Sequence, residues 1–219
     1  MKKNEAENKF EQYRKHLREE TLKLSIYIQL YKHLHHREQD RLDEMNIAPC
    51  FFQTVFSSLF TSIVQWIHNL LDFDAERGFF NFLTFIENNI KIFTVSSLQN
   101  RRNYPDGHWM LNRDPITFHT IESDRNKIKK IKSLSSIKTR RDKFHAHFDK
   151  KYAFEKKKIS SDAPIKNTDL DEIVLVMKDI LDKYSAAYDG GVYDFKPLNI
   201  YDVDDLLDAL HKYNQCNKC

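Results

Sequence analysis

The stretch CFFQTVFSSLFTSIVQWIHNLL, residues 50–71, is the most apolar part of the chain and indicates the class of fold. Its aromatic and aliphatic side chains recur nearly all round a helical circumference, which is typical of a helix at the centre of a bundle. Its glutamines, its histidine and its hydroxyl side chains make it too polar for a membrane span. The sequence therefore predicts a buried central helix.

Two longer patterns point to further helices. Apolar residues from Phe10 to Leu34 recur at steps of three, four and seven, which predicts a helix over about residues 4–43. The same period continues over about 167–189 and stops at Gly190-Gly191. Weaker patterns predict helices over about 76–98, from Asp114 through Ile137 into the segment that follows, and over 203–213.

Composition agrees with a helical protein. The 219 residues include only four glycines and five prolines, which leaves little material for hairpins. Because short loops between long helices make neighbours antiparallel, we expect an all-α fold, an up-and-down helical bundle with a short C-terminal helix. The bundle is predicted over residues 1–190, and a C-terminal extension with a polar tail over 191–219.

Charge and cysteine content restrict the setting. The net charge of +3 is too small to predict wholesale coating of nucleic acid, but basic residues concentrate between Lys127 and Lys158, which favours local phosphate binding. Three cysteines make no disulfide framework in a chain of this length. The first twelve residues lack the apolar region of a signal peptide. We expect a soluble, cytoplasmic protein without a membrane partner.

The segment TRRDKFHAHFDK, residues 139–150, holds the candidate chemistry. At about 100° per residue, Arg141 falls within an apolar stripe that contains Ile137 and Phe144. A buried arginine is costly unless it meets a carboxylate, a phosphate or a subunit boundary. In the ordinary alternative, Arg141 pairs with Asp142 or Asp149 on a charged helix.

Histidine and arginine together suit one reaction in particular. Histidine can take and give a proton near neutral pH, and arginine stabilises negative charge without losing its own. Such a pair can cleave RNA through its own 2′-hydroxyl. The chemistry requires no metal ligand, and we expect no cofactor.

Arg141-Asp142, followed after three residues by Ala146-His147-Phe148-Asp149, resembles the signature of the HEPN superfamily. The form is closest to the AbiU-type HEPN domains, which are associated with phage defence by abortive infection. The stretch IVQWIHNLLDFD, residues 63–74, is similar to the helix of those domains that ends in an Asp-bearing turn. The resemblance covers about residues 10–190.

The resemblance implies a homodimer in which two motifs form one composite, metal-independent ribonuclease site. It implies that His147 acts as general base or acid, that Arg141 contacts the scissile phosphate and that Asp142 orients Arg141. The products would be a 2′,3′-cyclic phosphate and a 5′-hydroxyl. A second register with compatible spacing stays open, in which Arg140 acts with His145 or with His147.

One position departs from some HEPN toxins. They carry a tyrosine two residues after the motif histidine, which a nucleotidyltransferase antitoxin modifies, whereas this chain has Asp149. The resemblance does not carry that modification over. An antitoxin of another kind, or a further component of a defence system, remains a candidate partner.

Basic side chains around the motif are candidate RNA contacts, although such runs are more often only a solvated face. A separate loop, NRRNYPDGHW over residues 100–109, combines arginines with aromatics that could stack on unpaired bases or pack as an ordinary loop. The expected ligand is RNA, with tRNA as one candidate. The predicted RNA-binding residues are Lys138, Lys143, Lys150, Lys151, Arg101 and Arg102.

Two histidine groups could suggest a metal, but neither has a full set of ligands at suitable spacing. They are His33, His35 and His36, and His211 with Cys216 and Cys219. We therefore predict no metal site. Two functions rival the ribonuclease: a non-catalytic HEPN-like module that binds nucleic acid or protein, and a structural subunit in which the motif is a salt-bridge network.

Overall fold

The protein is described by a computed structural model over residues 5–146, 158–197 and 199–216, with residues 144–146 described by their backbone alone. Every regular element in these ranges is helical, which confirms the predicted all-α class. The α-helices are α1 (Glu5–Asp40), α2 (Leu42–Met45), α3 (Pro49–Leu71), α4 (Phe79–Asn88), α5 (Val95–Arg102), α6 (Phe118–Lys129), α7 (Leu134–Thr139), α9 (Lys158–Asp162), α10 (Asn167–Asp189) and α11 (Asp202–Cys216). Two 3-10 turns, η1 (Ile90–Phe93) and η2 (Trp109–Leu111), and a π-helix, η3 (Arg140–Ala146), complete the set.

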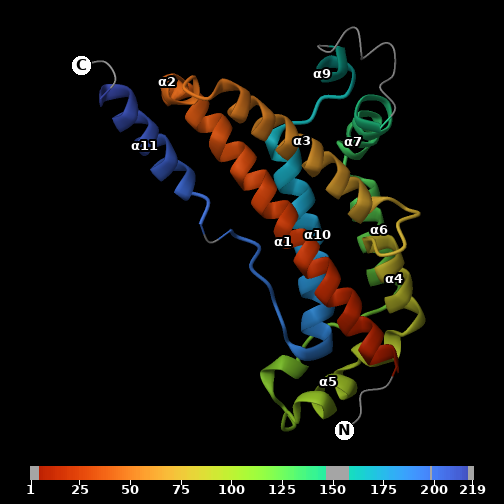
Figure 1. Cartoon of the computed structure of the whole chain (residues 1–219). Helices are drawn as coiled ribbons and strands as arrows, with labels where there is room; N and C mark the ends of the chain where they lie inside the picture. The colour runs from red at the N-terminus through yellow and green to blue at the C-terminus, as the bar shows by residue number, and fades with distance from the viewer. Residues whose placement is uncertain (1–4, 147–157, 198, 217–219) are drawn as a thin grey trace.

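Three long helices, α1, α3 and α10, form the centre of an up-and-down bundle (Figure 1). The short α2 reverses the chain, so α3 runs antiparallel to α1 and packs along it, and α10 packs antiparallel on another side of α1. Helices α4 and α6 pack side by side against this centre. α5 lies at one end of the molecule and α7 at the other.

Aromatic side chains build the core where α1, α4 and α10 meet. Phe10 is fully buried, and its ring centroid lies 5.0 Å from that of Phe93 and 4.5 Å from that of Tyr188. Tyr184 packs edge-on against Phe82 and is also fully buried. The abundant phenylalanine and tyrosine of the sequence therefore pack on one another in the core at this end of the bundle.

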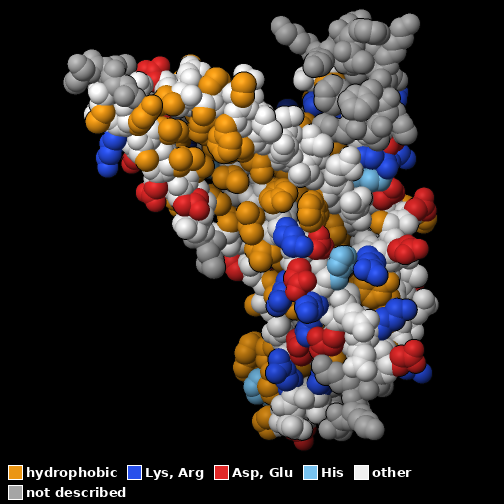
Figure 2. Space-filling model, viewed as in Figure 1, with side chains coloured by type: hydrophobic (Ala, Val, Ile, Leu, Met, Phe, Trp, Pro, Cys, Tyr) orange, Lys and Arg blue, Asp and Glu red, His pale blue; other side chains and the backbone are white. Residues whose placement is uncertain are grey.

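The sequence predicts that helix α3 is buried along its length, but mainly its second half is buried. Ile63, Val64 and Ile67 are fully buried, but Phe51 near the start of the helix is 54% exposed. The first half extends past α4 and α6, and hydrophobic side chains gather on the surface over this part of the molecule (Figure 2). By length and composition α3 is also the one helix in the described part of the chain that could cross a membrane.

Two predicted boundaries are wrong because local capping decides them. The helix expected over about 76–98 is broken into α4, η1 and α5, and Thr94 starts α5 by accepting a hydrogen bond from the Ser97 amide at 3.2 Å. The next helix begins at Phe118, where Thr117 and Thr120 form a reciprocal capping box, and not at Asp114. The predicted stop of α10 is confirmed, since Gly190 adopts a left-handed conformation there.

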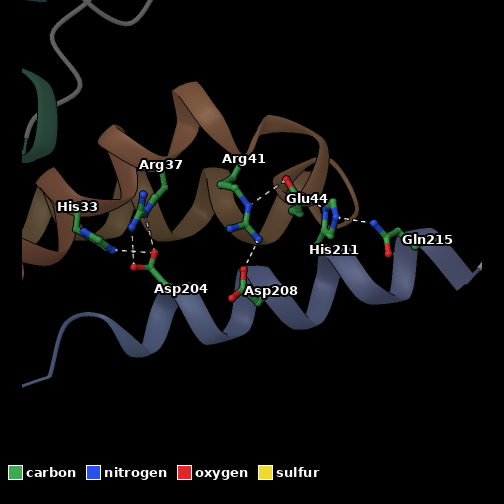
Figure 3. Close-up of polar contacts among 8 residues, drawn as sticks. All are labelled: His33, Arg37, Arg41, Glu44, Asp204, Asp208, His211 and Gln215. Atoms are coloured by element: carbon green, nitrogen blue, oxygen red, sulfur yellow. Dashed lines mark hydrogen bonds and ion pairs between the residues drawn. The ribbon is translucent and has the colours of Figure 1, made fainter.

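The C-terminal extension docks on the main bundle through α11, which runs parallel to the end of α1 (Figures 1 and 3). Leu207 is fully buried in a small apolar cluster with Leu34, Met45 and Phe52. A row of ion pairs borders this cluster. Its members are Arg37–Asp204 at 2.7 Å, His33–Asp204 at 3.0 Å, Arg41–Asp208 at 2.7 Å and His211–Glu44 at 2.5 Å.

A buried carboxylate joins α6 to α10. Asp124 is fully buried and accepts hydrogen bonds from Lys183 Nζ at 2.5 Å and from the Tyr184 hydroxyl at 2.9 Å. Burial, together with the charge of Asp124, raises the pKa of Tyr184, so this hydroxyl stays protonated and keeps donating. Because α6 leads directly into α7 and η3, this contact also fixes the origin of the segment that carries the motif.

Replacement of Asp124 by alanine is expected to lower the free energy of unfolding by about 3 kcal/mol, because it leaves the Tyr184 hydroxyl and the Lys183 ammonium without their shared acceptor. Urea unfolding followed by circular dichroism measures this. Glu122→Ala, which removes a half-exposed carboxylate from the same helix, is the matched control and should change the value by less than about 0.5 kcal/mol. Equal effects of the two changes would show that Asp124 does not anchor α6.

Candidate functional site

The motif segment is positioned by a bend and then by a π-helix. Helix α6 ends at Lys129, a turn follows, and α7 begins at Leu134 with Ile131 and Ile137 buried on either side of the bend. From Arg140 to Ala146 the chain is π-helical. Such i→i+5 segments are rare and occur frequently at functional sites. α7 and η3 both pack against α3.

The helical wheel predicted that Arg141 is the buried arginine, and this prediction is wrong. The structure buries Arg140 instead. Arg140 is 8% exposed, whereas the side chain of Arg141 is 26% exposed. Both residues lie within about 60° of Ile137 on a wheel, so periodicity does not separate them. Packing against α3 and the segment after α9 decides which of the two is covered.

Arg140 is held by its Nε and by an aromatic ring. Nε donates to the carbonyl of Ala163 at 2.6 Å, and the guanidinium carbon lies 5.1 Å from the Phe60 ring centroid. Among the residues that the structure describes, no carboxylate pairs with Arg140. Burial lowers the pKa of this guanidinium, but an arginine remains charged at neutral pH. Within the described residues, the cation of Arg140 therefore has no counter-ion.

Arg140 also lines a shallow surface hollow of about 460 Å³, here named the Arg140 hollow. Its walls come from α1, α3, η3 and the segment around α9. The lining residues are Tyr31, Phe56, Ser57, Phe60, Arg140, Ser160, Pro164 and Ile165.

Arg141 and Asp142 form an ion pair with each other, and both side chains are partly exposed. This is the pairing that the ordinary alternative predicts. It also agrees with the role implied for Asp142, which was to orient Arg141. An arginine held in this way keeps a planar array of donors that can exchange a carboxylate for a phosphate.

His68 on α3 is a nearby titratable group that sequence reasoning did not select. Its Nε2 lies 3.0 Å from Asp72 Oδ2, and its side chain is 12% exposed. Burial and the charges of Arg141 and Lys138 lower the pKa of His68, against the opposing effect of Asp72 and Asp142. The available signal was the i,i+4 spacing of His68 and Asp72 within the stretch that resembles HEPN domains.

The remaining motif residues are described in part. Lys138 and Lys143 are exposed on α7 and η3, beside Arg141. The backbone of His145 belongs to η3, but its side chain is not among those described. His147, Lys150 and Lys151 lie outside the described residues. Their roles stay predictions.

Arg101 and Arg102 lie on α5, at the opposite end of the molecule from α7 (Figure 1). Arg101 donates to the Tyr188 carbonyl at 2.5 Å and pairs with Glu7 at 2.7 Å, and Arg102 donates to the Asp189 carbonyl at 2.7 Å. They cap the free carbonyls at the end of α10. The structure does not bring them together with the motif, and their contact with RNA stays a prediction.

Three of the histidines considered as metal ligands have other partners, and Cys219 lies outside the described residues. His33 and His211 take part in the ion pairs that hold α11 (Figure 3), and His35 pairs with Glu38 at 3.0 Å. Within the described ranges, no group of three or more His, Cys, Asp or Glu side chains is placed to hold a metal ion.

Comparison with known families identifies the fold. The chain matches the AbiU2 family of HEPN domains over residues 7–209, which includes the bundle, the motif segment and part of α11. No curated protein and no solved structure matches it. The chain therefore belongs to the AbiU2-type HEPN family.

His68→Gln is expected to reduce the loss of stability on acidification. A histidine whose folded pKa lies below its unfolded value near 6.5 contributes stability that is present above about pH 6.5 and is lost as the pH falls through the folded pKa. The free energy of unfolding, measured in urea between pH 7.5 and 5.5, should therefore fall more steeply for the wild type than for the variant. His119→Gln, which replaces an exposed histidine on α6, should leave the wild-type slope unchanged. Parallel curves for wild type and His68→Gln would contradict this assignment.

Proposed function

We propose that this HEPN-domain protein is an endoribonuclease that cleaves RNA through the 2′-hydroxyl of its substrate, without a metal ion. Arg141 holds the scissile phosphate and stabilises the charge of the phosphorane, while His147 transfers the proton. The 2′-oxygen bonds to phosphorus, the bond from phosphorus to the 5′-oxygen breaks, and that oxygen receives a proton. The ends are a 2′,3′-cyclic phosphate and a 5′-hydroxyl.

The observation that carries this proposal is the ion pair of Arg141 and Asp142 on the π-helix that leads to His147. Both side chains are partly exposed, so part of the guanidinium is open to a phosphate while Nε lies beside Asp142. Arg140 has a different environment, since it is buried against Phe60 and Ala163. This difference favours the register of Arg141 with His147 over the register in which Arg140 acts with His145 or with His147.

The proposal includes a homodimer and a biological setting. Transesterification needs one group to accept a proton and another to donate one, and two motifs that meet across a two-fold axis supply both. Lys138 and Lys143, exposed beside Arg141, would steer the RNA backbone together with Lys150 and Lys151. The family supports a role in abortive infection or as a toxin in the cytoplasm.

A non-catalytic module is the second candidate. In such a module the Arg141–Asp142 ion pair holds an arginine that binds phosphate, and no proton transfer follows. The ribonuclease and the binding module differ in which activity is lost when the motif histidine is replaced. A catalyst loses cleavage and keeps RNA binding, whereas a binding module has no cleavage to lose.

His147→Ala is expected to reduce cleavage by at least about 100-fold, because the proton transfer loses its histidine. Purified wild type and variant are incubated with total cellular RNA and with tRNA in excess EDTA, and fragments are resolved on denaturing gels. His145→Ala tests the other register and His119→Gln controls for loss of an unrelated histidine. Intact RNA in all lanes, with folded and dimeric protein, would contradict the ribonuclease and favour the binding module.

Mixing wild type with His147→Ala tests whether the site is shared between two copies. After subunit exchange at equal amounts, a composite site that needs both histidines retains about one quarter of the activity of the same total wild-type protein, whereas a site within one chain retains about one half. Activity is measured at fixed total protein across several ratios. A linear dependence on the wild-type fraction would rule out the composite site.

A further inference from the structure

The Arg140 hollow contains a cation whose charge nothing in the described structure neutralises. Arg140 is more than nine-tenths buried, and its only hydrogen bond within the described residues leaves from Nε to Ala163. Its two terminal nitrogens have no partner among the described residues. The Arg140 side chain lines the hollow, which is open to solvent. Burying an arginine without a counter-ion is costly, and a bound anion would remove that cost.

The walls of the hollow fit an aromatic ligand as well as an anion. The centroid of the Tyr31 ring lies 5.6 Å from that of Phe60 and 6.3 Å from that of Phe56, so three rings of α1 and α3 form one continuous surface. Aromatic rings of this kind stack on unpaired bases. The hydroxyls of Ser57 and Ser160 add hydrogen-bonding groups suited to phosphate or sugar.

The position of the hollow relates it to the motif. Arg140 precedes Arg141 in η3, yet the two side chains have different surroundings, one in the hollow and one paired with Asp142. Two consecutive arginines with separate environments can hold two successive phosphates of one strand. A volume of about 460 Å³ lies within the range of small-molecule pockets and is sufficient for one nucleotide.

We propose that the Arg140 hollow is a subsite for one unpaired nucleotide of the RNA substrate, with its phosphate on Arg140 and its base against Phe60 and Phe56. This inference rests on the proposed function, because it places the nucleotide beside the phosphate that Arg141 holds. It makes Arg140 a binding and positioning residue and restricts the substrate to RNA that is single-stranded at the cleavage site. The hollow then contributes to selection of the cleaved position.

Binding of an RNA that cannot be cleaved tests the subsite separately from catalysis. The probe is a fluorescent single-stranded hexamer with 2′-O-methyl groups throughout, titrated with protein and followed by anisotropy, with a blunt 2′-O-methyl duplex for comparison. Arg140→Met keeps the volume and removes the charge, and Phe60→Leu removes the ring. The matched controls are Arg77→Met and Phe73→Leu, which change exposed residues on the loop between α3 and α4. Circular dichroism and urea unfolding confirm that each variant is folded, and Arg140→Lys keeps the charge if Arg140→Met does not fold.

We expect Arg140→Met to weaken binding of the single strand about tenfold or more and Phe60→Leu about fivefold, with both controls at the wild-type value. The duplex should bind more weakly than the single strand, and Arg140→Met should not weaken it further. Equal affinities of Arg140→Met and Arg77→Met for the hexamer would overturn the subsite. So would a loss of dimerisation in Arg140→Met without a change in affinity, because the hollow would then be a protein contact.

Cleavage of unmodified RNA by the same variants keeps the two proposals apart. If the wild type cleaves and Arg140→Met changes neither the affinity nor the cut positions, the subsite is wrong and the ribonuclease stands. If the wild type does not cleave but hexamer binding depends on Arg140, the subsite stands and the protein is a binding module.

Discussion

The position of the motif depends on the hydrogen bonds that the buried carboxylate of Asp124 accepts. It joins α6 to α10 through Lys183 and Tyr184, and α6 is the helix that continues through a bend into α7 and η3. The motif segment is also held by its packing on α3 and by the hydrogen bond from Arg140 Nε to the Ala163 carbonyl. Asp124 accepts hydrogen bonds from an ammonium and from a phenol of α10, so it ties α6 to that helix. A polar contact in the interior of the bundle thus helps to position the motif segment at one end.

The two adjacent arginines divide one task. Arg140 is buried beside the Phe60 ring, and no carboxylate among the described residues pairs with it. Arg141 stays near the surface with Asp142, close enough to His68 to influence its protonation. In our account the first holds a neighbouring nucleotide and the second the scissile phosphate. The basic residues at the other end, Arg101 and Arg102, instead cap the carbonyls of α10.

Much of the fold could be predicted because long helices carry their own signal. The apolar spacing of α1 and α10 and the glycine that ends α10 need no tertiary information. The break of the predicted 76–98 helix could not be predicted, because apolar periodicity continues through η1 while Thr94 restarts the helix. The exposure of Phe51 was missed for a related reason. An apolar residue indicates that its burial is favourable. It does not indicate whether a neighbouring helix extends far enough to cover it.

The site was predictable only as a list of residues. The motif and the Arg141–Asp142 pairing follow from local sequence, but the choice between Arg140 and Arg141 as the buried cation depends on Ala163 and Phe60, which are distant in the chain. The proximity of His68 to Arg141 could not be predicted for the same reason, because it arises only when α3 packs on η3. Nothing in the residues of α11 identifies α1 as its partner.

The most direct measurement of the central claim uses an RNA in which one cleaved position is known. That nucleotide alone is replaced by its 2′-deoxy form, and the RNA is incubated with the protein in excess EDTA. Our account predicts that cleavage at this position stops, that other positions are still cut, and that their fragments carry 2′,3′-cyclic phosphates and 5′-hydroxyls. Continued cleavage at the deoxynucleotide would show that the attacking group is not the 2′-hydroxyl and would contradict the mechanism.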